Sequence, residues 1–402
     1  MKKIVVLGGA GAMGQVIVRD LAEFSNYDSI VIADFNKAKA EELKNSLKSK
    51  KLEAAFTDLK NPESLAEVLK DAFLVINSTP YYFNVDVMKA ALAASCHYMD
   101  LGGLFHVTKQ QLELNDEFRT KGLAAILGMG AAPGMTNIMA AAGAGELDEV
   151  KSIDITVGCI DFVTTDHPLQ PPYAIDTILD EYTKEPMVFE DGEYRAKPPM
   201  SGEKLVQLPE PVGACKAILT LHSEVLTLPK TYEHKGCTDV TFRLGLPTEF
   251  HDRLKLLVDL GLGDNEKIET AEGKFTPRKV LAHLIERFPS SNQTPDDAEV
   301  VRVEVKGKRN GQPVNVTLET TVLAHKKWGL SCGALDTGVP PAIVADMLLA
   351  GTIMERGTIP PEVCVPHKEF FHELAKRTMV MRKTVEEVLV EAKTAEEKIM
   401  AR

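Results

Sequence analysis

The chain has 402 residues, of which 44% are hydrophobic and 26% charged, a composition typical of globular proteins. This length exceeds a single ordinary core, so two domains are expected. The formal net charge of −12 argues against nucleic acid or an anionic membrane surface as the main partner.

The apolar run near the first residue breaks at Gly8, too early for a signal peptide or a membrane span. A cytoplasmic location without membrane contact is therefore expected. The six cysteines are scattered, without a CxxC pair or a zinc-ligand spacing. This pattern predicts no metal site and favours buried free thiols in a reducing compartment.

Short apolar runs alternate with amphipathic helical patterns through residues 1–145. Asn36 stands where it would cap one helix, and Pro62 falls in the first turn of another. This rhythm predicts βαβ units, which form a parallel sheet with helices on both faces. The expected strands span residues 3–8, 29–34, 52–58, 73–80, 96–100 and 123–130, and the expected helices 13–24, 36–50, 61–71, 84–94 and 108–121.

The pattern changes after residue 145. A strand is expected at 152–158, whereas residues 161–211 are rich in proline and lack helix–strand alternation. Another strand is expected at 237–245, and residues 300–320 are typical of a hairpin closed by the turn sequence "RNGQ". The middle region is thus expected to form an antiparallel sheet with helices. The helical pattern that follows is expected to pack back on the first domain.

Gly9, Gly11 and Gly14 match the pattern G-x-G-x-x-G between the first expected strand and helix. There the first glycine allows a tight turn, the second admits a pyrophosphate, and the third lets helix and strand pack closely. The N–H groups of this segment, those of Ala12 and Met13 included, then face the diphosphate at the helix start. A purely structural turn is the alternative, but the context favours a dinucleotide.

Polar residues at the ends of the next strands extend this site. Asp34 ends the second strand, where a carboxylate bonds a ribose 2′-hydroxyl and repels a 2′-phosphate. NAD is therefore favoured over NADP, although Lys37 and Lys39 are near. Asp58 ends the third strand and either borders the adenine or caps the following helix. The nicotinamide half is expected beside residues that follow the fourth and fifth strands, namely Asn77, Thr79, Pro80 and Gly102.

With these residues placed, the chain resembles the saccharopine dehydrogenase family over nearly its full length. The likeness is carried by "GGAGAMG", "YYFN", "MDLGG" and "GMGAAPGMTN", which follow the first, fourth, fifth and sixth expected strands. The resemblance implies a Rossmann domain and an inserted α+β domain that binds substrate and often mediates dimerisation. It also implies nicotinamide-dependent oxidation of a C–N bond in an amino acid or its secondary amine.

Two positions depart from the saccharopine enzymes that form glutamate. Ala132 stands where these enzymes usually have an aspartate, just before the Pro-Gly of the sixth-strand loop. Val157 aligns with a cysteine of those enzymes, and Cys159 lies two residues further on. The differences argue against saccharopine itself as substrate. Lysine 6-dehydrogenase, which has the same alanine, is the nearest branch of known chemistry.

Oxidation of an amine needs a base for the ammonium proton and a carbon held against the nicotinamide ring. His222 and Glu224 form a titratable pair whose spacing would place both on one face of a strand, with a polar interface patch as the alternative. Tyr81 lies at the mouth of the fourth strand and is a candidate for contact with substrate. Asp100 either binds a substrate ammonium or caps the next helix. Arg243 either holds a substrate carboxylate or forms a surface or interdomain ion pair.

We therefore predict an α/β protein with an N-terminal doubly wound parallel Rossmann domain, residues 1–130, completed by a C-terminal helical return at 336–402. An inserted α+β domain at 131–335 is expected to bind substrate and mediate dimerisation. The expected activity is hydride transfer from a C–N group of an amino acid to NAD, giving an imine that is hydrolysed, in a homodimer or higher homo-oligomer. A non-catalytic dinucleotide-binding or redox-sensing protein is the alternative.

Overall fold

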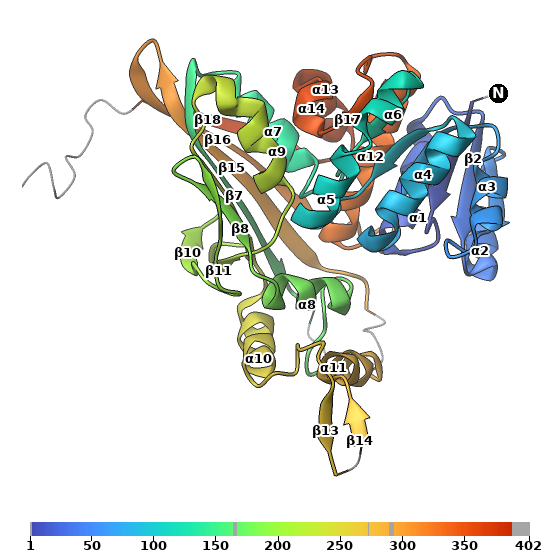
Figure 1. The fold of residues 1–402 in the computed structure, drawn as a ribbon, viewed down its shortest axis with the longest axis horizontal. Coiled ribbons are helices and arrows are strands. Elements are labelled where there is room, and N and C mark those ends of the chain that lie inside the picture. Colours follow the sequence, from blue (N-terminus) through green and yellow to red (C-terminus); the bar gives the residue numbers. More distant parts are fainter. Residues whose placement is uncertain (1, 164–166, 272, 289–292, 388–402) are drawn as a thin grey trace, which may run out of the picture.

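The computed structural model describes residues 2–163, 167–271, 273–288 and 293–387, which form two large sheets with helices between them (Figure 1). The first sheet has seven parallel strands in the order β17-β6-β5-β4-β1-β2-β3, so the predicted doubly wound sheet is confirmed. Its strands are β1 (Lys3–Leu7), β2 (Ser29–Asp34), β3 (Leu52–Phe56), β4 (Ala72–Asn77), β5 (His97–Asp100), β6 (Ala124–Ile126) and β17 (Gly357–Ile359). The order reverses between β1 and β4, where ligands of such sheets bind.

The helices of the first domain follow the predicted pattern with one exception. Asn36 and Asn61 accept hydrogen bonds from first-turn N–H groups and thereby begin α2 and α3. The single helix expected at 108–121 is two helices, because the N–H groups of Glu113 and Leu114 bond carbonyls three residues back and tighten the chain into a turn. The helices are α1 (Ala12–Phe24), α2 (Lys37–Leu47), α3 (Pro62–Leu69), η1 (Tyr81–Phe83), α4 (Asn84–Ala94), α5 (Leu104–Leu112) and α6 (Asn115–Thr120).

The second sheet has nine strands and is mixed rather than antiparallel throughout, since β12 runs parallel to β7. The predicted hairpin is confirmed as β15 and β16, and Asn310 and Gly311 turn between them with positive φ. The strands are β7 (Glu149–Asp161), β8 (Met187–Glu190), β9 (Glu193–Ala196), β10 (Lys204–Gln207), β11 (Ala214–Leu219), β12 (Asp239–Gly245), β15 (Asp297–Arg309), β16 (Gln312–Leu323) and β18 (Arg382–Glu387). β13 (Ile268–Thr270) and β14 (Gly273–Phe275) form a separate hairpin that projects from the body (Figure 1).

Helices cover one face of the second sheet and join it to the first domain. The proline-rich region that was expected to lack helix–strand alternation contains α8 and several short strands. A Cβ on Gly338 would lie 2.5 Å from Cβ of Val16, so α12 packs directly on α1. The helices are α7 (Met135–Ala144), α8 (Ile175–Thr183), α9 (Glu224–Tyr232), η2 (Glu233–Lys235), α10 (Thr248–Asp259), α11 (Pro277–Glu286), α12 (Cys332–Leu349), α13 (Pro361–Cys364) and α14 (His367–Lys376).

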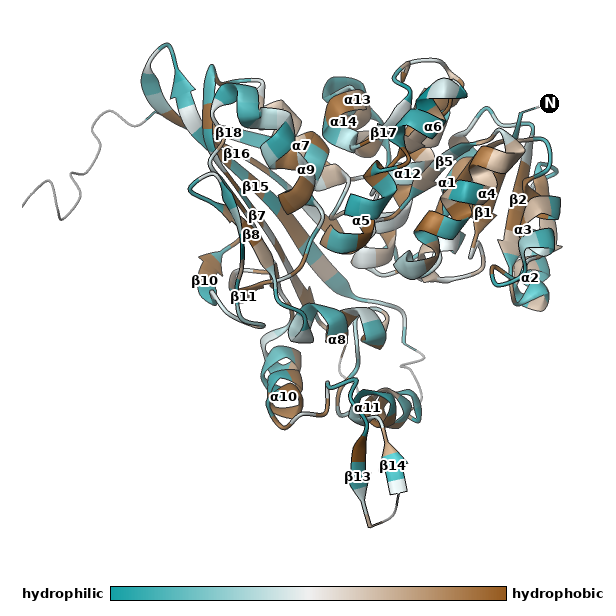
Figure 2. Cartoon of the chain, viewed as in Figure 1, coloured by the Kyte–Doolittle hydropathy of each residue, from teal (hydrophilic) through white to brown (hydrophobic). Residues whose placement is uncertain are grey.

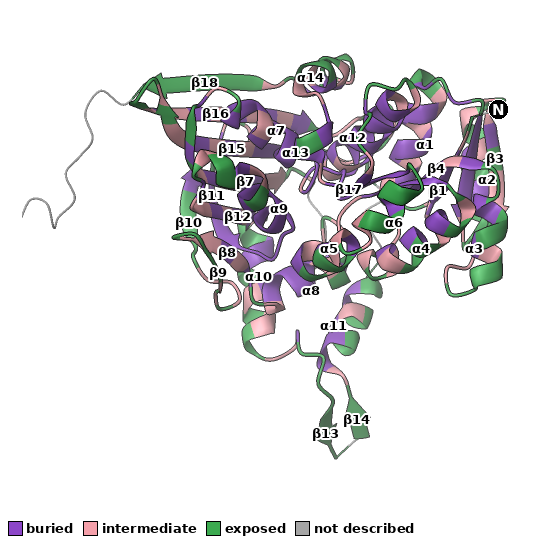
Figure 3. Ribbon diagram, turned by 45° about the horizontal axis from the view of Figure 1, so that its top comes forward, coloured by how far each residue is buried: buried purple, intermediate pink, exposed green. Residues whose placement is uncertain are grey.

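The long helix α12 lies in the core between the sheets and is largely hydrophobic and buried (Figures 2 and 3). By length and composition alone it is apolar enough to cross a membrane. However, 78% of it is buried inside the protein. Each of the six cysteines is a free thiol, and five of them are buried. The described residues contain no group of acidic, histidine and cysteine side chains arranged to hold a metal ion.

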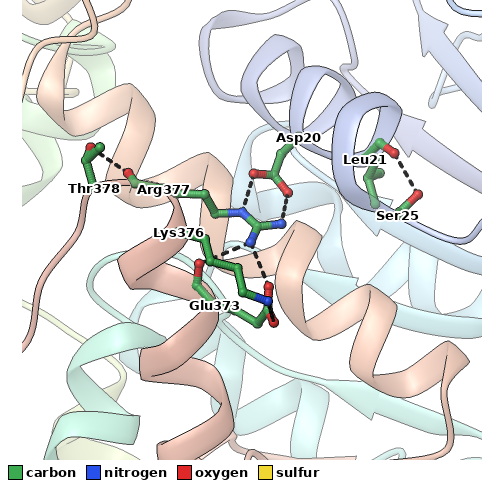
Figure 4. A network of polar contacts seen from close by, with 7 residues as sticks. All are labelled: Asp20, Leu21, Ser25, Glu373, Lys376, Arg377 and Thr378. Atoms are coloured by element: carbon green, nitrogen blue, oxygen red, sulfur yellow. Dashed lines mark hydrogen bonds and ion pairs between the residues drawn. The ribbon is translucent and has the colours of Figure 1, made fainter.

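The C-terminal part of the chain contacts both sheets. Arg377 forms a two-pronged ion pair with Asp20 of α1, with Nη2–Oδ1 and Nε–Oδ2 distances of 2.8 and 2.6 Å, and holds the end of α14 on the first domain (Figure 4). Beyond it β18, a strand that the sequence did not predict, pairs with β16 of the second sheet. Residues 388–402 of the predicted helical return lie outside the described residues, and the domain limits at 130 and 336 stay a prediction.

Candidate active site

The glycine segment between β1 and α1 leaves no room for a side chain at Gly8, Gly9 or Gly14. Gly8 has a φ of +69°, and a Cβ on Gly14 would lie 2.1 Å from the Gly8 carbonyl oxygen. Gly11 is the N-cap of α1, and no side chain caps this helix. The N–H groups of Ala12 and Met13 in the first turn therefore have no intrahelical partner. This bare, electropositive helix end fits a diphosphate, so the residues present fit the predicted dinucleotide.

Asp34 closes the loop on the side where the adenosine is expected. Its Oδ2 atom accepts a hydrogen bond from Ala10 N at 3.0 Å, and its Oδ1 atom accepts one from Asn36 N at 2.8 Å. Each carboxylate oxygen can accept a second bond, so the carboxylate is oriented and still able to bind a ribose hydroxyl. Phe35 directly follows β2, and Phe56 is the last residue of β3. Their rings are 5.7 Å apart and both exposed, and they offer apolar surface to a flat base.

Asp58 does not cap the helix after β3, contrary to one of its two predicted roles. The cap is Asn61, whose Oδ1 atom accepts hydrogen bonds from Glu63 N and Ser64 N at 2.9 and 3.2 Å. Asp58 instead accepts a hydrogen bond from Lys60 N at 2.9 Å, which closes a local turn. Contact with the adenine stays a prediction.

The turn after β4 lies beside the glycine loop, as expected at the reversal of the strand order. Asn77 Oδ1 accepts a hydrogen bond from Thr79 Oγ1 at 2.6 Å, and its Nδ2 group donates to Asn84 Oδ1 at 2.9 Å. A Cβ on Gly8 would lie 2.9 Å from Thr79 Cγ2, so the two loops are in contact. Pro80 then begins η1 and brings the chain to a pair of tyrosines. This is the edge at which the nicotinamide half is expected.

Tyr81 joins this edge to the second domain. Its hydroxyl donates to Asp180 Oδ2 at 2.7 Å and accepts from Lys184 Nζ at 2.8 Å. Asp180 also pairs with the buried guanidinium of Arg278, with 2.7 Å between Oδ1 and Nη1. Burial alone would raise the pKa of Asp180, but the Tyr81 hydroxyl, Arg278 and Lys184 lower it overall. Burial raises the pKa of Tyr81, so its phenol stays protonated and holds the contact.

Asp100 positions two loops and is not open to a ligand. Its Oδ1 atom accepts hydrogen bonds from Gly102 N and Gly128 N at 2.9 and 2.7 Å. Its Oδ2 atom accepts from the Tyr98 hydroxyl at 2.8 Å and from Gln111 Nε2 at 2.5 Å. The carboxyl is fully buried and its acceptors are occupied, so neither the predicted ammonium contact nor the predicted helix cap is made.

Gly102 is constrained by protein packing. Gly102 and Gly128 both have positive φ, and Cβ atoms on them would lie 2.9 and 2.6 Å from the ring of Pro133. Only glycine combines this backbone with so close a neighbour. The loops after β5 and β6 therefore pack tightly together, and a contact between Gly102 and the cofactor stays a prediction.

His222 and Glu224 meet as predicted, although not on a strand. His222 lies in the loop after β11, and Glu224 is the first residue of α9. The distance between His222 Nδ1 and Glu224 Oε2 is 3.3 Å, and Glu224 Oε1 accepts a hydrogen bond from Thr136 Oγ1 at 2.9 Å. The Phe242 ring stacks on the imidazole at 3.5 Å between centroids and 11° between planes, and so fixes its orientation.

A second carboxyl, that of Glu181 in α8, lies on the other side of His222 and was not predicted. His222 Nε2 lies 4.0 Å from Glu181 Oε1, and the Tyr173 hydroxyl donates a hydrogen bond to Glu181 Oε2. Burial raises the pKa of Glu181 to about 7. Because Glu181 directly follows Asp180, the Tyr81 contact and the His222 pair are joined through one turn of α8. Apolar residues at helical spacing in residues 175–182 could have identified this helix.

Arg243 lies away from this histidine, contrary to its predicted role as a holder of the substrate carboxylate. Arg243 and Phe242 are neighbours on β12 and therefore point to opposite faces of the sheet. Phe242 faces His222, whereas Arg243 Nη1 donates to Thr241 Oγ1 at 2.8 Å and lies 3.9 Å from Asp154 Oδ1. Its alternative role as an ion-pairing residue agrees with these contacts.

Known proteins match this chain along most of its length. Two family profiles match it: the saccharopine dehydrogenase NADP binding domain at residues 4–126 and the saccharopine dehydrogenase C-terminal domain at residues 130–379. The carboxyaminopropylagmatine dehydrogenase of Synechocystis sp. is 23% identical over 91% of this chain and 94% of its own. The carboxynorspermidine synthase of Vibrio cholerae is 26% identical over 89% of this chain and 91% of its own.

Solved structures show the same fold. The apo saccharopine dehydrogenase (L-Glu forming) of Saccharomyces cerevisiae has a TM-score of 0.76 at 19% identity, covering 96% of this chain and 100% of that chain. The homospermidine synthase of Legionella pneumophila, in complex with NAD, has a TM-score of 0.68 at 12% identity, covering 98% of this chain and 94% of that chain. Since one profile alone spans more than half of the residues, this protein belongs to the saccharopine dehydrogenase family.

Proposed function

We propose that this protein is a nicotinamide-dependent oxidoreductase that makes or breaks a C–N bond in an amine derived from an amino acid. The observation that carries the proposal is the hydrogen bond of 2.7 Å between Tyr81 and Asp180. This hydrogen bond joins α8 to the edge of the first sheet at which the nicotinamide is expected. The residue after Asp180 in α8 is Glu181, whose carboxyl faces His222. We therefore expect this titratable pair to lie beside the hydride-transferring ring.

The chemistry divides between the cofactor and the side chains. When bound, the nicotinamide supplies the redox step by taking up a hydride from the carbon next to nitrogen. The Glu181–His222 pair takes the proton that the ammonium must lose beforehand, with Glu224 orienting the imidazole from the other side. Water then adds to the imine carbon and releases an amine and a carbonyl compound. In the reverse direction the same pair returns the proton to nitrogen.

The buried acids favour a cationic substrate. Glu181 and Glu224 lie at 6% and 0% exposure on either side of His222, where a bound ammonium would offset their charge. The Synechocystis and Vibrio relatives are named for compounds in which a carboxyl group is joined to an amine-bearing chain. These names support the same class of substrate. The preference for NAD over NADP is proposed from Asp34 alone. The matched profile is named for NADP, whereas the Legionella structure holds NAD.

The test is a substrate panel assayed in both directions by the absorbance of reduced nicotinamide. Secondary amines that carry a carboxyl group are offered with NAD or NADP, and amine–aldehyde and amine–keto acid pairs with the reduced cofactors. We expect turnover of a member of this panel by the wild type and its loss in His222→Ala. Tight dinucleotide binding by calorimetry without turnover of any panel member would replace this proposal by the non-catalytic alternative.

A further inference from the structure

The stretch "GMGAAPGMTN" contains a buried threonine that the mechanism above does not use. Thr136 lies in the first turn of α7 and is fully buried. Its hydroxyl donates a hydrogen bond to Glu224 Oε1 at 2.9 Å, and the other oxygen of that carboxyl, Oε2, lies 3.3 Å from His222 Nδ1. Side chains from α7, from α9 and from the loop before α9 therefore form one line of contacts that ends on the imidazole.

The loop after β6 fixes the position of Thr136. The N–H group of Thr136 donates to Ala131 O at 3.0 Å, which ties the first turn of α7 to this loop. The loop is in turn held at Gly128, whose N–H group donates to the buried carboxyl of Asp100 at 2.7 Å. Thr136 thus has a set position relative to the edge of the first sheet at which the nicotinamide is expected.

Other groups hold α9 against α7. Asn137, the residue after Thr136, donates from Nδ2 to Thr227 Oγ1 at 3.3 Å and to Glu362 Oε2 at 2.8 Å. Thr227 follows Glu224 by three residues and lies on the same side of α9. Since these contacts dock the helix on α7, the hydrogen bond from Thr136 to Glu224 is not needed for that purpose.

The direction of each hydrogen bond determines what the imidazole can do. An ionised carboxylate accepts hydrogen bonds and donates none. A neutral imidazole that meets the Oε2 atom of such a carboxylate carries its N–H group on Nδ1, and its lone pair is then on Nε2. Nε2 of His222 is the nitrogen that faces Glu181, at 4.0 Å from Oε1, while the stacked Phe242 ring holds the plane of the imidazole.

We propose that Thr136 is a positioning residue, which orients the Glu224 carboxylate and thereby keeps the proton of neutral His222 on Nδ1. Nε2 is then the nitrogen that accepts the proton of the substrate ammonium. This inference rests on the proposed function and deepens it, because it assigns the base to one atom. It also makes the loop after β6 responsible for both the edge of the first sheet and the orientation of the base.

The test reads the tautomer of His222 directly and needs no substrate. The full chain with isotope-labelled histidine is saturated with NAD and held at about pH 9, where an ordinary imidazole is neutral. The chemical shifts of the two ring nitrogens show which of them carries the proton, and His222→Ala identifies the signals. We expect the proton on Nδ1 in the wild type. Thr136→Val keeps the shape but lacks the donor, and should show a mixture of both tautomers.

Three further variants separate orientation from folding. Thr136→Ser restores the hydroxyl and should restore the wild-type tautomer. Thr227→Val makes the same chemical change at a buried position on the same side of α9, and should keep the wild-type tautomer. Thr136→Ala should repeat the effect of Thr136→Val if that variant fails to fold.

Turnover gives a second measurement. With the substrate that the panel identifies, Thr136→Val should lower kcat by about 10- to 100-fold, the usual value of a hydrogen bond to a charged group. Dinucleotide affinity should be unchanged, and Thr136→Ser should recover most of the rate.

A proton on Nε2 in the wild type, an unchanged tautomer in Thr136→Val or a changed one in Thr227→Val would overturn the inference. Turnover of a panel member would in that case leave the proposed function standing. Conversely, the expected tautomers in a protein without turnover would keep the role of Thr136 and remove the oxidoreductase.

Discussion

The two sides of the seam between the first and second domains present different chemical groups. On the cofactor side, one short segment of glycines presents backbone N–H groups, and its shape admits no side chain at Gly14. On the opposite side, buried carboxyls come from two separate helices: Glu181 from α8 and Glu224 from α9. Backbone groups recognise the diphosphate that every nicotinamide dinucleotide carries, and they do so whatever the side chains are. A single side chain, by contrast, can be replaced by mutation, and the replacement changes which ligand is recognised. We therefore expect the first side to hold the cofactor and the second to select the substrate.

The largest expected effect is the loss of dinucleotide binding on the cofactor side. In Gly14→Ala the new Cβ would lie 2.1 Å from Gly8 O and 2.7 Å from Gly9 Cα, so the loop must open. We expect no binding of either dinucleotide by calorimetry and a loss of about 1–3 kcal/mol in the free energy of unfolding. Gly11→Ala is the control, because its Cβ would meet only Gly8 O at 3.1 Å, and it should keep the fold. Equal cofactor binding by Gly14→Ala and wild type would mean that this loop does not hold the diphosphate.

The next effect is a loss of turnover through a change on the substrate side, with dinucleotide binding on the cofactor side unchanged. His222→Ala should lower kcat by about 10²–10⁴-fold, the usual contribution of a general acid–base group, with unchanged dinucleotide affinity. Arg243→Ala is the matched control, since Arg243 points to the opposite face of the same sheet, and its kcat should equal that of the wild type. The reverse pattern would return Arg243 to the site and exclude His222.

A smaller effect concerns the pH dependence set by Glu181. Burial raises the pKa of this carboxyl from 4.5 to about 7, so amine oxidation should increase as the pH rises through about 7. Glu181→Gln should lack this limb of the pH–rate profile. Tyr173→Phe removes a hydrogen bond that lowers the pKa of Glu181 and should shift the limb to higher pH. A limb that stays in place in both variants would belong to another group.

The same carboxyl affects stability with a definite sign. Because its pKa is higher in the folded protein, its contribution to stability is present below about pH 4.5 and is lost as the pH rises through about 7. Above that pH the wild type holds a buried charge that Glu181→Gln lacks. Denaturant unfolding at mildly alkaline pH should therefore show the variant to be more stable, by at most ~3 kcal/mol.

The smallest effect concerns the preference of the cofactor side for NAD over NADP. Asp34→Ala should reduce the preference for NAD over NADP, because it removes the ribose acceptor and the repulsion of a 2′-phosphate. It should also weaken both dinucleotides modestly, since the carboxylate holds Ala10 N and Asn36 N. Asp58→Ala, which loses only a local turn contact, should keep the wild-type ratio of affinities. A wild type that already prefers NADP would contradict this assignment.

The cofactor side was predictable because its signals are local. The spacing of Gly9, Gly11 and Gly14, with Asp34 at the end of the next strand, lies within one βαβ unit. The substrate side was predictable only where partners are close in sequence, as for His222 and Glu224. Glu181 reaches His222 only through the tertiary packing of α8, and nothing in its local sequence marks it as a partner of that histidine.

The prediction for Arg243 failed for a related reason. A strand predicts that neighbouring side chains alternate between faces, but the sequence does not say which face will be covered. Here the face of β12 that carries Phe242 meets His222, and Arg243 is left on the other. Likewise, Asp100 was a sound candidate by position, and only the structure shows that its four acceptor contacts are already made.

The edge strands have a consequence for how the chain folds as it is synthesised. β17 completes the first sheet and β18 the second, and both come from residues beyond 356. A nascent chain that has emerged only as far as β6 leaves that strand without its outer neighbour, an open edge on which other chains can add. The first sheet is complete only after β17 has left the ribosome and the second only after β18, so both sheets are completed by the same late stretch of the chain, unlike domains that fold one after another.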